Sequence, residues 1–80
     1  VEELGSTLRR YGESVRYYQE QALPEAEQLQ KTADLQFRES ETDITEYIQS
    51  MNAAVEIRKG YIESVRQYNV AALEYELYHE

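Results

Sequence analysis

The chain has 80 residues and carries 16 acidic against 8 basic side chains, a net charge of −8. This length allows one small domain, and the acidic excess excludes the basic face that binders of nucleic acids and anionic membranes need. Only 17 residues are Leu, Ile, Val or Met, and Cys is absent, so we expect a thin core without disulfides. A single His and no Cys also argue against a transition-metal site, and no metal ligand or cofactor is predicted.

The first half of the sequence predicts a long amphipathic helix over about residues 2–39. Gln, Glu, Ala, Leu and Arg dominate this stretch, and all of them favour helix. Apolar side chains recur at steps of three and four, the spacing of a coiled-coil seam, whereas a strand would need alternation. The stripe consists of Leu4, Leu8, Tyr11, Val15, Tyr18, Ala22, Ala26, Leu29, Ala33 and Phe37.

Pro24 lies inside this predicted helix. It has no N–H to donate, and its ring presses against the carbonyl of Glu20, so we expect a kink near Pro24. The alternative is a true break, with Pro24 as the first residue of a new helix. We favour the kink because the apolar stripe continues across it.

The second half predicts another helix, over about residues 43–78, after a tip at about 40–43. Thr42 or Asp43 can cap it, and with Asp43 as the cap Glu46 falls at the capping-box position. Two helices of about 35 residues, each about 50 Å long, predict an all-α antiparallel hairpin of the coiled-coil type, one domain over residues 1–80. The second helix carries two adjacent stripes, one of Ile44, Ile48, Met51, Val55, Ile62, Val65 and Ala72 and the other of Tyr47, Ala54, Ile57, Tyr61, Tyr68 and Tyr75.

A helix with two apolar stripes buries against more than one neighbour. Since the sequence starts with Val1, we expect a fragment of a longer chain, and further helices would come from that parent. In isolation we expect a soluble homodimer that pairs two hairpins into a four-helix bundle.

A short internal echo links the two halves. The pattern Tyr-x-Glu-Ser-Val-Arg-x-Tyr occurs at residues 11–18 and again at residues 61–68. If the turn centres near residue 41, the two segments lie nearly level on opposite arms. A pseudo-repeat and convergence of two similar helices explain the echo about equally well.

Candidate catalytic groups are few. Glu13 with Arg16, and Glu63 with Arg66, have the spacing of surface ion pairs on a helix. His79 stands near the C-terminal end, and no Ser or Thr has a neighbouring His to activate it. We therefore expect that the chain is not an enzyme.

The order and spacing of residues around the tip resemble a known family over about residues 11–78. The chain is similar to the C-terminal helical hairpin of TolC-like outer-membrane factors, and most similar to the version fused to, or paired with, heavy-metal efflux pumps of the CusA/CzcA type. These pumps belong to the resistance-nodulation-division (RND) class. The residues that carry the resemblance are Tyr17, Tyr18, Ala22, Leu23, Pro24, Ala26, Glu27, Ala33, Phe37, Ser40, Glu41, Ile44, Glu46, Tyr47, Ile48, Gln49, Ile57, Arg58, Tyr61, Val65, Tyr68, Asn69, Ala71 and Leu77.

The resemblance implies a structural role in transport. In this family a homotrimer assembles such hairpins into a periplasmic tunnel at the outer membrane of Gram-negative bacteria, and the hairpin tips meet the adaptor (membrane fusion) protein that links the channel to the RND pump. The implied adaptor-binding tip comprises Phe37, Arg38, Glu39, Ser40, Glu41, Thr42 and Asp43.

Two positions depart from the family pattern. The family commonly has Gly in the turn where this chain has Ser40, which adopts the left-handed conformation less easily. Some members carry two acids that form a tunnel constriction. Here Glu46 matches the first, but Gln49 stands at the second, which puts a strong acidic ring in doubt. The alternative function is a generic coiled-coil interaction module unrelated to export.

Overall fold

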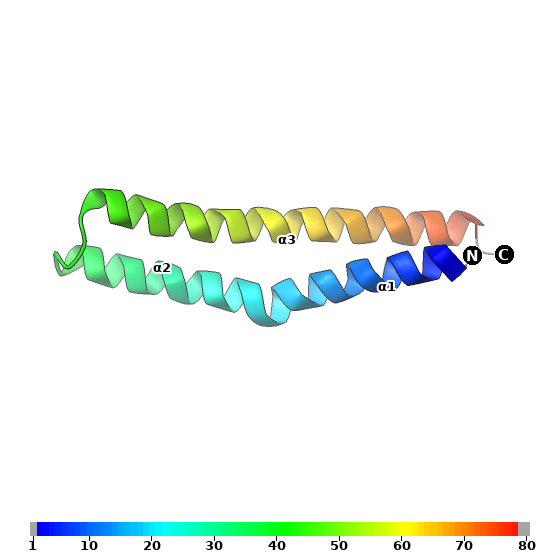
Figure 1. Cartoon of the computed structure of the whole chain (residues 1–80), viewed down its shortest axis with the longest axis horizontal. Helices are drawn as coiled ribbons and strands as arrows, with labels where there is room; N and C mark the ends of the chain where they lie inside the picture. Colours follow the sequence, from blue (N-terminus) through cyan, green and yellow to red (C-terminus); the bar gives the residue numbers. More distant parts are fainter. Residues whose placement is uncertain (1, 79–80) are drawn as a thin grey trace.

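The computed structural model describes residues 2–78, which form two helical arms joined by a short turn (Figure 1). The first arm consists of α1 (Glu2–Tyr17), the π-helical turn η1 (Tyr18–Ala22) and α2 (Leu23–Arg38), and the second arm is the single helix α3 (Ile44–Tyr78). The arms run antiparallel and side by side in a rod of 60 × 18 × 13 Å. The predicted all-α helical hairpin is confirmed, and residues 2–78 contain no strand.

The observed helix bounds differ from the expected ones by one residue at the tip. The first arm ends at Arg38, because Glu39 leaves the helical conformation with φ −92° and ψ 8°. The second arm begins at Ile44, because Asp43 is the capping residue before the helix and not its first helical residue. The turn therefore covers residues 39–43.

The first arm bends at η1 and stays helical through Pro24 (Figure 1). The Leu23 N–H donates to the carbonyl of Tyr18, five residues back instead of four, which makes this turn wider than an α-helical one. Pro24 follows directly in the first turn of α2. A wider turn before proline is a common way for a helix to bend around the missing N–H donor, so the chain has a kink here and not a break.

Small side chains form the contact between the arms. Ala26 and Ala54 are completely buried, and no large side chain among residues 2–78 is fully buried. Because alanine projects only a methyl group, the two backbones can approach closely, but little apolar area leaves water. The buried residues are Ala22, Ala26, Ala33, Ala54, Ser64 and Ala71.

The two stripes of α3 have different surroundings. The stripe that contains Tyr47, Ala54 and Tyr61 faces the first arm, since Ala54 is buried and both tyrosines contact residues of that arm. In the other stripe Ile44 and Ile62 are 54% and 68% exposed. The hairpin therefore satisfies one apolar face of α3 and leaves the other uncovered.

Candidate interaction surfaces

The tip is a tight turn that closes α2 in a Schellman arrangement. The Glu41 N–H donates to the Gln36 carbonyl at 2.8 Å, and the Ser40 N–H donates to the Phe37 carbonyl at 3.1 Å. Ser40 has a φ of 60°, and no other residue in the described part of the chain, glycines included, has a positive φ. Serine thus adopts the left-handed conformation that glycine takes more easily.

On the other side of the turn, Asp43 and Glu46 start α3. The Glu46 N–H donates to Oδ1 of Asp43 at 2.8 Å, and the Asp43 N–H donates to Oε1 of Glu46 at 3.4 Å. These reciprocal bonds are the predicted capping box, with Asp43 and not Thr42 as the cap.

Tyr47 holds the tip against the end of α2. Its hydroxyl donates to Oδ1 of Asp34 at 2.8 Å, and its ring stacks on Phe37 with centroids 4.7 Å apart. The structure thus brings the seven predicted tip residues together at one end of the rod, on a turn closed by backbone bonds and supported by an aromatic pair. All of them except the half-buried Thr42 are exposed: Phe37, Arg38, Glu39, Ser40, Glu41 and Asp43.

Replacement of Ser40 by glycine is expected to stabilise the hairpin. A left-handed residue with a Cβ costs about 1 kcal/mol relative to glycine, so S40G should raise the free energy of unfolding by about that amount in urea titrations at fixed protein concentration. Ser50, within α3, serves as the control, because glycine inside a helix destabilises it by about 0.5–1 kcal/mol. Loss of stability in S40G would contradict the assigned backbone conformation.

The bond between Tyr47 and Asp34 gives the tip a pH dependence. The Tyr47 hydroxyl donates to the Asp34 carboxylate, and this hydrogen bond raises the pKa of Tyr47 above the ordinary value of 10.0. A tyrosine whose pKa is higher in the folded state contributes stability below its unfolded pKa and loses it as pH rises through the folded one. Between pH 9 and 12, wild type should therefore lose more stability than Y47F.

This comparison needs a control because the chain has eight tyrosines. Tyr78 is 66% exposed at the far end of the hairpin, and Y78F should follow the wild-type pH profile of unfolding. A parallel decline of wild type and Y47F would show that the bond does not form.

The two residues of the predicted constriction, Glu46 and Gln49, are both exposed in the first two turns of α3. The Glu46 carboxylate is engaged with the backbone of Asp43, and Gln49 carries no charge. Their role in a tunnel stays a prediction.

Tyrosine rings of each arm pack against glycines of the opposite arm. An added Cβ at Gly60 would lie 2.9 Å from Cζ of Tyr18, and one at Gly12 would lie 3.2 Å from Cε1 of Tyr68. Tyr18 also lies 6.3 Å, centroid to centroid, from Tyr61. These contacts put the two copies of the echo, residues 11–18 and 61–68, opposite each other, so the predicted level placement is confirmed.

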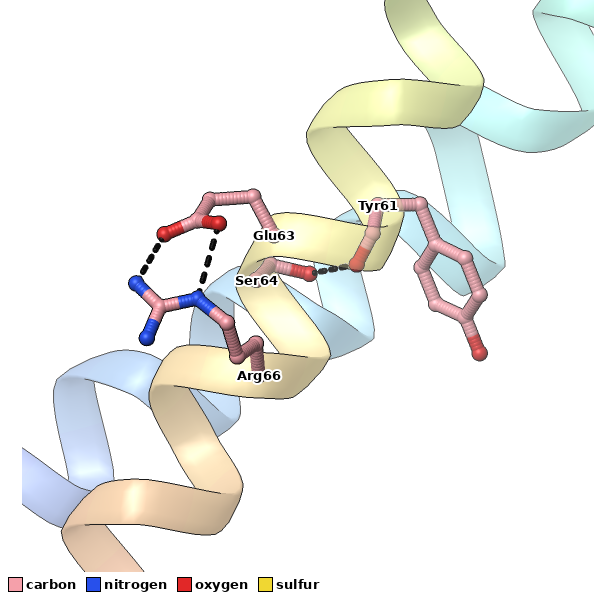
Figure 2. A network of polar contacts seen from close by, with 4 residues as sticks. All are labelled: Tyr61, Glu63, Ser64 and Arg66. Atoms are coloured by element: carbon pink, nitrogen blue, oxygen red, sulfur yellow. Dashed lines mark hydrogen bonds and ion pairs between the residues drawn. The ribbon is translucent and has the colours of Figure 1, made fainter.

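The polar groups of the echo differ between its copies. Arg66 pairs with Glu63 as expected, and hydrogen bonds from its guanidinium lower the pKa of the Glu63 carboxyl (Figure 2). The expected pair of Arg16 with Glu13 is wrong: Arg16 binds Glu20 at 2.8 Å. The second copy has Val70 at the corresponding place, so Arg66 has no such acid on its C-terminal side.

Two buried or half-buried polar side chains of α3, Ser64 and Arg58, have hydrogen-bond partners. The Ser64 hydroxyl donates to the Tyr61 carbonyl at 2.7 Å (Figure 2). Arg58, which interrupts the Ile stripe, reaches the first arm and donates to Oε1 of Gln30 at 2.8 Å. Only the second of these bonds joins the two arms. Among residues 2–78, no group of three or more acidic or histidine side chains could hold a metal ion, and His79 lies outside the described residues.

The outer face of α3 is the second candidate surface. We call Ile44, Ile48, Val55, Ile62 and Leu73 the outer row, since steps of 4, 7, 7 and 11 keep them on one side of a helix. All five are more than two-fifths exposed. The sequence predicted most of this stripe, but it did not predict that this stripe is exposed and that the tyrosine stripe is covered by the first arm. The glycines opposite the tyrosines were the available signal, because a glycine within a helix lets the opposite arm approach closely.

Comparisons with protein-family models, with curated proteins and with solved structures found no match to this chain. No helix within residues 2–78 has the length and hydropathy to cross a membrane. The features that bear on function are therefore the two surfaces, the tip and the outer row, and the resemblance of the sequence.

Proposed function

We propose that the chain is an assembly segment of the periplasmic tunnel of an outer-membrane efflux channel. The channel would be a homotrimer that works with an adaptor and an RND pump to export heavy-metal cations. The role of the chain is structural: its hairpin is one of the helical hairpins that form the tunnel wall, and its tip docks the adaptor.

The observation that carries this proposal is that α3 has apolar side chains on two sides, of which only one is covered. One face of this helix packs against the first arm, and the outer row remains exposed along nearly all its length. A wall of side-by-side helices needs members with apolar contacts on both flanks. A hairpin that served only as a self-contained spacer would have a polar outer face.

The tip supports the docking part of the proposal. Its backbone is fixed by the Schellman bonds and by the capping box, so its exposed side chains are presented by a rigid support. Within residues 2–78, Glu39 and Glu41 form no ion pair, and both carry negative charge at the end of the rod. Such a tip is suited to a partner with basic residues.

Charge reversal at the tip tests this function in the source cells. With both Glu39 and Glu41 replaced by Lys in the chromosomal gene, we expect lower survival under heavy-metal stress and loss of cross-links between the protein and a periplasmic adaptor. The reason is that like charges would then oppose docking, while the bonds that close the turn come from the backbone.

The matched control reverses two exposed acids far from the tip, Glu3 and Glu13, which changes the net charge by the same amount. This variant should keep wild-type survival and cross-links. Equal behaviour of the two double variants would contradict tip docking.

A further inference from the structure

Exposed apolar side chains are unequally distributed between the two arms. Within residues 2–78, nine large hydrophobic side chains of α3 are exposed, against three of the first arm. The three on the first arm are Tyr17, Leu35 and Phe37, and they are scattered. The outer row of α3, by contrast, follows one side of a helix of 35 residues. Exposed apolar rows of this kind mark interaction sites on small proteins.

Charge is also unevenly distributed along the chain. Residues 1–43 contain ten acidic and five basic side chains, whereas residues 44–73 contain three of each. On α3 two of these acids are paired within the helix, Glu56 with Lys59 at 3.6 Å and Glu63 with Arg66. The net charge of −8 is therefore carried by the first arm (−2), by the turn at residues 39–43 (−3) and by the last seven residues (−3), whereas residues 44–73 of α3, which contain the outer row, are neutral.

This distribution of charge indicates what kind of molecule covers the outer row. An acidic partner would gain nothing from a neutral face, and a basic partner would bind the turn or the acidic end of α3 instead. Two copies that met through α3 would join neutral surfaces and bury the outer rows. We propose that a second copy of this chain covers the outer row, α3 against α3, in an antiparallel four-helix bundle.

The order of side chains along α3 favours the antiparallel arrangement. If position i faces position 117 − i of the second copy, Ile44 meets Leu73 and Val55 meets Ile62, so four of the five row members face another member. The fifth, Ile48, meets Asn69. In this register Arg58 meets Lys59 of the second copy, but Arg66 meets Met51, whereas a parallel pair would place all three of these cations against their own copies, which repel. This pairing does not depend on the export function, because it is a property of the isolated chain.

Sedimentation equilibrium of the 80-residue chain tests the proposal. We expect a species of about 19 kDa, twice the chain mass of 9.4 kDa, and at least a tenfold weaker dimer in I62E, because each copy would bury a carboxylate. Leu35 is the matched control, since it is 49% exposed on α2 and L35E adds the same charge. L35E should remain as dimeric as wild type.

Three results would overturn the proposal: a monomeric wild type, a trimeric wild type, or equal dimer stability in I62E and L35E. I48E provides a second test on the same row if I62E loses its helicity by circular dichroism. None of these results depends on heavy-metal survival, so failure here is distinguishable from failure of the proposed function.

Disulfide formation tests the orientation, because the chain has no Cys of its own. In a mixture of I44C and L73C chains, the antiparallel bundle should give mainly mixed disulfides. Its two copies of position 44 lie about 44 Å apart at 1.5 Å per residue. Predominant I44C–I44C disulfides would overturn the antiparallel arrangement.

Discussion

Alanine at Gly60 is expected to destabilise the hairpin by about 1–2 kcal/mol, although alanine is the better helix former. Its Cβ would meet the ring of Tyr18, with Cζ 2.9 Å away and the hydroxyl oxygen closer still. Tyr18 has little room to move, because it packs edge-on against Tyr17 and beside Tyr61. Urea unfolding at fixed protein concentration measures the loss.

A double variant makes this prediction specific. In a Y18A background the obstacle is gone, so G60A should stabilise the hairpin by about 0.5–1 kcal/mol through helix propensity alone. Gly5 is the matched control, because its added Cβ would lie 3.6 Å from Tyr75, an ordinary contact distance. G5A should therefore not destabilise. The same loss from G60A in both backgrounds would contradict the contact with Tyr18.

Leucine at Ala54 is expected to have the largest effect of the substitutions proposed, with a loss of about 2–3 kcal/mol. Ala54 is completely buried between the arms, and three extra heavy atoms would separate backbones that approach through methyl groups. Thermal unfolding followed by circular dichroism measures the loss.

The neighbouring alanine provides the control. Ala53 is exposed on the same helix, so A53L should change the stability by no more than about 0.5 kcal/mol. If A54L and A53L behaved alike, the close contact of the arms through small residues would be wrong.

The sequence was sufficient to predict the elements that depend on local patterns. Steps of three and four identified both helices, and Asp43 followed three residues later by Glu46 identified the start of α3, since a capping box is a local arrangement. The bend at Pro24 follows from the missing N–H of one residue. In these cases the physical cause lies within a few positions of its effect.

Features that depend on the opposite arm could not be predicted in the same way. Both stripes of α3 are apolar, and the choice between them depends on how Tyr18 and Tyr68 fit the glycines across the hairpin. The left-handed Ser40 is set by the closure of the turn, not by the preference of serine. Likewise Arg16 had two acids within reach, and the sequence does not decide between Glu13 and Glu20.

The small core of the hairpin makes burial of its exposed apolar surface important for its stability. Its inner contact consists of alanines, one buried serine and half-buried tyrosines, with no large side chain fully enclosed within residues 2–78. Small cores of this kind depend on additional burial by a partner. In a dimer of the isolated chain, contact between the outer rows of the two copies supplies this burial. In the proposed tunnel, the neighbouring helices would supply it.

An antibody raised against this hairpin, used on fractionated source cells, tests the proposed function most directly. The proposal predicts a large polypeptide in the outer-membrane fraction, in complexes with a periplasmic adaptor after cross-linking. A small cytoplasmic chain of about the mass of this one would contradict the proposal and favour a coiled-coil interaction module unrelated to export.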